Sequence, residues 1–512
     1  MSGQKYKILL VGLVLFSILD LLGCTSISPG NPDTKNHAQE FYGGVAADEP
    51  RAALEGQKIL SAGGNAADAA TAVYFTLAVT LPTKASLGGG GVCMIFDQKA
   101  EKIEAINFLN YTTSDSFANT SRPSTVPGNP MGIFSIHARY GSFQWARLVA
   151  VGEQLARFGT QASRTLVNDI IPLSAELAAD PGSREIFFMQ NGKMVNEGSL
   201  IRQLDLAASL SSLRLNGAAG FYRGRFARLF VKSSRDAGRP ISLRDLAEYK
   251  PKWSEVLSQK FGFHEVNFMP PPSLGGLVSA KIFSMLGKNN LFEDAPDDER
   301  YHILAEIESQ YFVDFSHWLR DNLSSTSSQL RQKKYMKNNI PTTSFVVADR
   351  YGSVVACSLT MNDNSGIGRM AMGTGIMLAA APKGPAMLGP IIVRNKNSNN
   401  LIFAGVSSGG LAAPTALMNV FARTMMTGED LNQAISAKRV HYSGASDITF
   451  YEPGLSEKAK FFLKDRGHHL QETPIIGLVN VVYCSGGLSS TTETCVVKSD
   501  PRGSGLASKL SK

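Results

Sequence analysis

The sequence predicts a globular protein of mixed α/β structure, because its composition, its helical periodicity and its short apolar runs agree. Of the 512 residues, 43% are hydrophobic and 18% are charged, which is ordinary for a folded chain with a sizeable core. Helical patterns cover 50–60 and 65–79, where Asn65 is placed to cap the second helix, and 140–325 is mostly helical. Strand-like apolar runs cover 92–96 and several segments in the last third of the chain.

The first forty residues predict export and a lipid anchor. Two lysines precede an apolar run over 8–19, which is too short to span a bilayer but suits a secretory signal peptide. The sequence LLGC, ending at Cys24, resembles a bacterial lipobox, so we expect cleavage before Cys24 and lipidation of its thiol. A plain signal peptide followed by an incidental cysteine is the alternative. Residues 1–23 then form the signal peptide and 24–40 a tether, which predicts an exported lipoprotein of the cell membrane or outer membrane, on the periplasmic side.

Charge and motif content limit the class of partner. The formal net charge is +8, but the basic residues are scattered and no nucleic-acid-binding motif is found, so we expect no nucleic-acid partner. There is no Cys-x-x-Cys pair, and the eight histidines lack ligand spacing, so we expect no metal and no other cofactor. The glycine run 88–91 is not a phosphate-binding loop, because no Gly-Lys-Ser/Thr follows it.

The cysteines after Cys24 fall in or beside strand-like runs. Cys93 and Cys357 lie inside apolar runs, so we expect them to be buried thiols. Cys484 and Cys495 end two strand-like runs joined by a Gly/Ser/Thr-rich loop. A hairpin would bring these two together, and export permits oxidation, so we expect a disulfide between them.

Thr342 stands where a polar segment meets a strand. Residues 324–341 lack apolar periodicity, whereas 344–349 and 353–359 read as two strands around a turn. A flexible segment that joins a core strand at a threonine is the arrangement that self-cleavage requires. Most loop-to-strand junctions have no such role, so this pattern alone decides nothing.

Ordered motifs along nearly the whole mature chain resemble the gamma-glutamyltransferase (gamma-glutamyltranspeptidase) family. The matching segments are 63–70, 87–91, 245–250, 269–276, 342–343, 360–362, 405–410 and 499–502. The resemblance implies an αββα four-layer sandwich of the N-terminal-nucleophile hydrolase type, in which one precursor is cut into two fragments that stay together. The cut would fall between Pro341 and Thr342, separating a large-subunit region, 41–341, from a small-subunit region, 342–512.

The resemblance also assigns roles to individual residues. Thr342 becomes the nucleophile, and its new α-amine, with an ordinary pKa of roughly 7.7–8.0, serves as the base. Thr360 is expected to hydrogen-bond the Thr342 hydroxyl, and Asn362 to contact the polar head of the substrate. The backbone amides of Gly409 and Gly410 are expected to form the oxyanion hole. Without the resemblance, these residues would read as a strand threonine, a turn asparagine and a tight bend.

Ser407 is a second candidate nucleophile. Residues 405–409 fit the G-x-S-x-G elbow of α/β-hydrolases around Ser407, and Asp447 and His468 follow as candidate partners. The glycine pair is already explained by the resemblance, and no α/β-hydrolase pattern covers the rest of the chain. Ser407 is therefore the weaker candidate.

The departures from the family concern the substrate. Members that take gamma-glutamyl groups usually read Asp-Phe-Arg-Glu where 107–110 reads Asn-Phe-Leu-Asn, so Leu109 replaces the arginine that grips the α-carboxylate. The aspartate that binds the α-amine is missing from 379–384, and the serine pair expected near Ala386 and Met387 is absent. The stretch from Gly384 to 388–390 is far shorter than usual, which removes the lid loop. Lys383 is the cation placed to substitute for the arginine.

The expected function is a gamma-glutamyltransferase-like acyltransferase or amidohydrolase with altered acyl specificity. Its substrate is a small or polymeric amide, and simple gamma-glutamyl compounds should be poor substrates, because an unpaired carboxylate is costly in a desolvated pocket. The alternative is a catalytically silent relative that serves as a binding protein of the cell envelope.

Overall fold

The computed structural model describes residues 41–111, 125–322, 341–444, 447–488 and 495–511, with side chains undescribed at 289, 312–322 and 511. The expected signal peptide 1–23, the lipidation site Cys24, the tether 24–40 and residues 323–340 of the polar segment lie outside these ranges. Residues 40–512 form one unit. No helix within the described ranges is long and apolar enough to cross a membrane.

Two antiparallel sheets form the centre of the unit. The first has the strand order β20-β1-β9-β10-β2-β3-β6 and the second the order β19-β18-β14-β13-β8-β7. The strands of the first sheet are β1 (Phe41–Ala47), β2 (Gly90–Asp97), β3 (Lys102–Asn107), β6 (Lys252–Ser254), β9 (Thr342–Asp349), β10 (Val354–Thr360) and β20 (Leu506–Ser511). Those of the second are β7 (Leu257–Phe261), β8 (His264–Phe268), β13 (Ile391–Asn395), β14 (Leu401–Ser408), β18 (Leu478–Cys484) and β19 (Cys495–Ser499).

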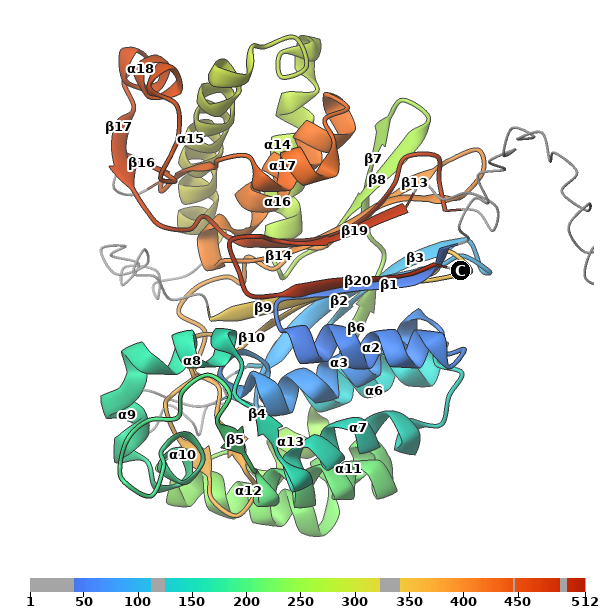
Figure 1. The fold of residues 1–512 in the computed structure, drawn as a ribbon, viewed down its shortest axis with the longest axis vertical. Coiled ribbons are helices and arrows are strands. Elements are labelled where there is room, and N and C mark those ends of the chain that lie inside the picture. Colours follow the sequence, from blue (N-terminus) through green and yellow to red (C-terminus); the bar gives the residue numbers. More distant parts are fainter. Residues whose placement is uncertain (1–40, 112–124, 323–340, 445–446, 489–494, 512) are drawn as a thin grey trace, which may run out of the picture. The chain divides into compact units, whose positions relative to one another are not determined.

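The two sheets pack face to face, and helices cover both outer faces (Figure 1). Fully buried side chains such as Val92, Val346, Ile392 and Val406 form the apolar layer between the sheets. The first sheet is covered by α2 (Pro50–Ser61), α3 (Ala66–Thr80), α6 (Asn129–Tyr140), α7 (Trp145–Phe158) and α11 (Leu204–Tyr222). The second is covered by α14 (Gly275–Leu286), α15 (Asp297–Asn322), α16 (Ala413–Phe421) and α17 (Leu431–Ser436). This is the four-layer αββα arrangement that the resemblance implied.

Smaller elements surround the sandwich. The short helices are α4 (Pro82–Ala85), α8 (Arg164–Ile170), α9 (Ser174–Ala179), α10 (Pro181–Phe187), α12 (Gly224–Asp236), α13 (Leu243–Glu248) and α18 (Glu457–Asp465). The short strands are β4 (Thr160–Gln161), β5 (Leu200–Ile201), β11 (Met370–Ala371), β12 (Ile376–Met377), β15 (Val440–Tyr442), β16 (Ile448–Tyr451) and β17 (His469–Glu472).

Helix α3 shows how the sequence builds the layer under the first sheet. The Asn65 side chain accepts from the backbone N–H of Asp68, and the Asp68 side chain accepts from the backbone N–H of Asn65. This capping box starts the helix where the sequence predicts it. Every residue of α3 is buried, and its alanines allow neighbouring elements to approach closely. The helix can therefore lie between the first sheet and the outer helices.

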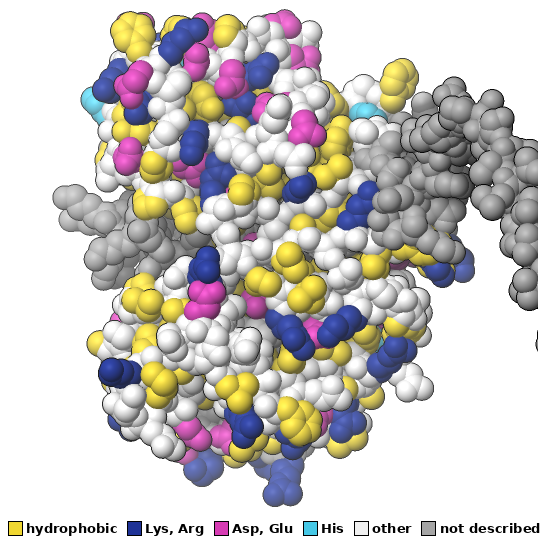
Figure 2. Space-filling model, in the orientation of Figure 1, with side chains coloured by type: hydrophobic (Ala, Val, Ile, Leu, Met, Phe, Trp, Pro, Cys, Tyr) yellow, Lys and Arg dark blue, Asp and Glu magenta, His cyan; other side chains and the backbone are white. Residues whose placement is uncertain are grey.

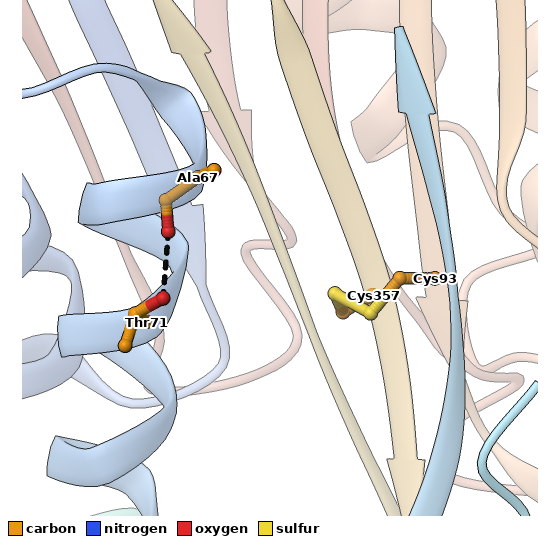
Figure 3. The surroundings of a disulfide bond; sticks show 4 residues. All are labelled: Ala67, Thr71, Cys93 and Cys357. Atoms are coloured by element: carbon orange, nitrogen blue, oxygen red, sulfur yellow. Dashed lines mark hydrogen bonds between the residues drawn. A yellow bond between two sulfur atoms is a disulfide. The ribbon is translucent and has the colours of Figure 1, made fainter. Parts of the chain in front are cut away.

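The region 140–325 is mostly helical, as expected, but it also contains the hairpin β7–β8, which forms one edge of the second sheet. One expectation needs correction. Cys93 and Cys357 are not free thiols, because they form a disulfide between β2 and β10 (Figure 3). They lie directly opposite each other in the antiparallel pair, with Cα atoms 4.1 Å apart. Their separation of 264 residues in the sequence hides this register.

The structure also joins Cys484 to Cys495, across the last register pair of β18 and β19. Their Cα atoms are 4.0 Å apart. The hairpin expected from the sequence therefore brings these two residues together.

Candidate active site

Thr342 begins β9 in the middle of the first sheet. It is paired in register with Thr360, the last residue of β10, and Thr360 is paired in turn with Gly90 of β2. Because directly opposite residues of neighbouring strands point to the same face, the two threonine side chains are neighbours. Each threonine is only 4% exposed, so the candidate nucleophile starts in a largely dry environment.

The hydroxyl of Thr342 is held from the second sheet. The backbone N–H of Gly409, just beyond the end of β14, donates to Thr342 Oγ1 at 3.0 Å. Gly409 has φ +145°, and a Cβ there would lie 2.6 Å from the Cα of Gly477. Only glycine fits this position, for both conformation and space. The described hydrogen bonds place Gly409, and not Gly410, on the Thr342 hydroxyl.

The carbonyl group of Pro341, immediately before Thr342, is held by two donors. The backbone N–H of Met361 donates to Pro341 O at 3.2 Å, and the Thr360 hydroxyl donates to it at 3.4 Å, a long contact. Thr360 Oγ1 itself accepts from the backbone N–H of Asn362 at 2.9 Å, which directs its own proton toward the carbonyl. In the uncut chain Thr360 therefore contacts Pro341, and its expected bond to the Thr342 hydroxyl stays a prediction for the cleaved state.

Asn362 lies at the head of the site, in a chain of side-chain amides. Its Nδ2 donates to Asn110 Oδ1 at 3.0 Å and to the carbonyl oxygen of Ala380 at 2.7 Å. Asn110 Nδ2 donates in turn to Thr125 Oγ1 at 2.6 Å. Asn110 and the Met361 amide were missed from the sequence. In the sequence Asn110 stands out only as part of a changed motif, and a backbone amide leaves no sequence signal.

The glycines of β2 allow neighbouring backbone to approach the strand closely. A Cβ on Gly90 would lie 2.5 Å from the amide nitrogen of Asn110. Absence of a side chain here lets 108–110 pass against β2, beside Thr360. The glycine run thus shapes the site.

Leu109 and Lys383 occupy the region where the substrate's head is expected. The Leu109 side chain packs against the apolar layer between the sheets, and its carbonyl accepts from the Tyr249 hydroxyl at 3.1 Å. Lys383 forms an ion pair with Asp363, and the lysine side chain is 56% exposed. The cation that the sequence offered as a substitute for arginine is thus already paired.

The competing triad is not assembled. Ser407 is buried and donates to the carbonyl oxygen of Ala413 at 2.7 Å. The His468 ring contacts His302 and Thr449, while Asp447 accepts from Tyr442 at 2.9 Å. The three side chains make separate contacts, so the structure does not join them into a catalytic unit.

Within the described part of the chain, no group of three or more His, Cys, Asp or Glu side chains could hold a metal ion. On the face shown in Figure 2, Lys and Arg side chains are interspersed with acidic and apolar ones. That face therefore has no continuous basic patch.

Comparison with known proteins decides the family. The model of the gamma-glutamyltranspeptidase family matches residues 52–340 and 383–510, well over half of the chain. The chain belongs to the gamma-glutamyltranspeptidase family. As a member, it is a hydrolase or transferase that acts on amide bonds. The matched ranges omit 341–382, so the roles expected of Thr342, Thr360 and Asn362 stay predictions.

Individual relatives support this family assignment. Glutathione hydrolase 3 of Arabidopsis thaliana is 26% identical, covering 86% of this chain and 81% of the relative. The glutathione hydrolase proenzyme of Escherichia coli (strain K12) is 28% identical, covering 83% of this chain and 85% of the relative. The crystal structure of cephalosporin acylase from Bacillus halodurans matches with a TM-score of 0.76, covering 95% of this chain and 99% of that one. At 21% identity that likeness shows the fold alone.

Proposed function

We propose that this gamma-glutamyltranspeptidase family member is a proenzyme that cuts itself between Pro341 and Thr342. The freed Thr342 then acts as the nucleophile of amide hydrolysis or acyl transfer. One observation carries the proposal: the hydroxyl and the carbonyl that must react are held at the same junction by separate donors. Gly409 holds the hydroxyl, while Met361 and Thr360 hold the carbonyl oxygen.

The cleavage step follows from these contacts. Thr342 Oγ1 attacks the carbonyl carbon of Pro341, and the negative charge that develops on Pro341 O is stabilised by the Met361 N–H and the Thr360 hydroxyl. The hydroxyl proton passes to the Thr342 nitrogen as the C–N bond breaks, which leaves an ester. Water then hydrolyses the ester, which releases the Pro341 carboxylate and restores the Thr342 hydroxyl beside the amine that the first step set free.

The free amine changes the chemistry of the same residue. In the uncut chain the Thr342 nitrogen is an amide and cannot act as a base, whereas afterwards it can accept the hydroxyl proton. Attack on a substrate amide then forms an acyl-enzyme and releases the amine product. Water or an acceptor amine resolves the acyl-enzyme. The Gly409 N–H already lies at the reacting oxygen.

The test is a denaturing gel of the purified protein run with reductant, followed by N-terminal sequencing. Two fragments are expected, the smaller beginning at Thr342. The variant Thr342→Ala should stay intact and inactive, because it lacks the attacking hydroxyl. The matched control is Ser407→Ala, which should be cut and active like the wild type. An intact, fully active wild-type chain would overturn the proposal.

The acyl group is proposed to differ from gamma-glutamyl. Two features support this: Leu109 places a partly buried apolar side chain against the layer between the sheets, and Lys383 is paired with Asp363. An α-carboxylate would thus lack the usual bidentate arginine, one of the stronger polar contacts in a site. The cleaved enzyme should prefer aliphatic acyl anilides to the gamma-glutamyl anilide. A glutaryl anilide, which keeps the carboxylate and lacks the amine, shows which of the two groups is disfavoured. A preference for the gamma-glutamyl anilide would show that another group replaces the arginine.

A lipid anchor on Cys24 remains part of the proposal, supported by the lipobox-like sequence before it. The tether 24–40 would hold the enzyme away from an anchoring membrane. Stable anchoring needs more than one acyl chain, which the lipoprotein pathway supplies. Cys24→Ser should move the protein to the soluble fraction, and equal membrane binding of the variant would point to another anchor.

A further inference from the structure

The carboxylate of Asp48 lies beneath the candidate active site and binds both sheets. Asp48 follows β1 directly and is buried. Its Oδ2 accepts from the Thr343 hydroxyl at 3.1 Å, the Ser344 backbone N–H at 2.8 Å and the Ser408 hydroxyl at 2.9 Å. Its Oδ1 accepts from Asn480 Nδ2 at 2.7 Å. One side chain thus joins β9 of the first sheet to β14 and β18 of the second.

Two of these partners are direct neighbours of the reacting groups. Thr343 follows Thr342, and Ser408 precedes Gly409, whose N–H donates to the Thr342 hydroxyl. We propose that Asp48 is a positioning residue that sets the distance between the Thr342 hydroxyl and the Gly409 amide. This inference rests on the proposed role of Thr342.

The chemistry of the group explains why a carboxylate stands here. All four partners are neutral donors, and an ionised carboxylate only accepts, so its two oxygens satisfy all of them together. Burial raises the pKa of the Asp48 carboxyl, which shows that the site is costly for a charge. An amide of the same size would turn an NH₂ group toward donors and leave some of them unpaired.

The strand β9 offers a matched control. Asp349, at its other end, is also buried and accepts from the backbone N–H groups of Ala66, Tyr351 and Ser353 at 2.9–3.1 Å. At about 3.3 Å per residue it lies roughly 23 Å from Thr342. Asp349→Asn therefore removes a buried carboxylate from β9, the strand that begins at Thr342, without touching the reacting groups.

The experiment compares Asp48→Asn, Asp349→Asn and the wild-type full-length chain. It measures the half-time of self-cleavage on reducing gels, then kcat and KM with the acyl anilide that the wild type turns over fastest. A misplacement of about 1 Å costs on the order of 100-fold. Asp48→Asn should slow cleavage and lower kcat by about that factor, with KM changed less than about threefold. Asp349→Asn should stay within about threefold of wild type in both rates, although thermal unfolding shows a similar loss of stability.

Ser408→Ala decides the question if Asp48→Asn does not fold. It removes one donor and leaves the carboxylate, and it should slow cleavage by about tenfold, which is about 1.4 kcal/mol. Wild-type rates in Asp48→Asn or Ser408→Ala would overturn the role of Asp48 and leave the proposed function standing. Slowing of Asp349→Asn equal to that of Asp48→Asn would do the same. A wild-type chain that is never cut would overturn the proposed function and this inference with it.

Discussion

The nucleophile end and the head-group end of the candidate site are built differently. Around Thr342 the contacts come from buried strand ends and backbone amides, with Gly409 and Met361 as donors. At the head-group end they come from side chains on loops, such as Asn110 and Asn362, and the lysine of the Lys383–Asp363 pair is largely exposed. Backbone donors persist when side chains change, whereas loop side chains can be exchanged one at a time. The reaction centre can thus be kept while the acyl group that it accepts changes.

The largest effect should come from breaking the nucleophile end. In Gly409→Ala the new Cβ would meet Gly477 at 2.6 Å, and φ +145° disfavours any side chain. The amide would move away from Thr342 Oγ1. The resemblance also expects this amide in the oxyanion hole, and loss of an oxyanion-hole donor costs roughly 100- to 1,000-fold in kcat. The kcat of Gly409→Ala with the preferred acyl anilide, compared with that of the wild type, measures this loss.

The control for that variant is Gly467→Ala. Gly467 has φ +85° but no neighbour within 4 Å of a Cβ, so it tests the backbone strain alone. Its kcat should match that of the wild type. Equal losses in both variants would mean that strain, and not the amide at Thr342, accounts for the effect.

A smaller effect should come from restoring the arginine that binds the α-carboxylate in the family. Leu109→Arg places a guanidinium where the family resemblance leads one to expect it, and should raise kcat/KM for the gamma-glutamyl anilide by about tenfold, chiefly through KM. Leu109→Met keeps the volume of leucine and adds no charge, so it should not raise kcat/KM for the gamma-glutamyl anilide. A folded Leu109→Arg enzyme without improvement would mean that the head-group end has changed beyond this residue, for instance at 379–384, where the amine-binding aspartate is missing.

The smallest effect is expected at Lys383. Its ion pair with Asp363 is partly exposed, and such pairs contribute about 0–1 kcal/mol. Lys383→Ala should therefore leave kcat/KM for the gamma-glutamyl anilide within about threefold of wild type. A loss of 30-fold or more would show instead that Lys383 binds the α-carboxylate in place of the family's arginine.

Local patterns predicted the elements that frame the site. The cap at Asn65, the strands on both sides of 350–352 and the hairpin ending at Cys484 and Cys495 follow from turn, cap and periodicity rules, and the structure confirms them. The family model likewise confirms the resemblance read from the motifs.

What the sequence missed is contact between distant segments. Asp48 meets Thr343 across 295 residues, and Cys93 meets Cys357 across 264. No local pattern encodes such pairs, because they arise from strand order and register. The β7–β8 hairpin was missed for a different reason: it is short and lies within a largely helical region.

The disulfide between Cys93 and Cys357 has a consequence for the mature protein. Cys93 lies before the proposed cut and Cys357 after it, so the bond would join the two fragments covalently. Cys484 and Cys495, by contrast, both lie in the smaller fragment. Self-cleavage would then yield a branched molecule with two amino termini, held at a crosslink in the middle of its central sheet. Without reductant it would migrate as a single band, and in a reducing compartment strand pairing and packing alone would hold the fragments together.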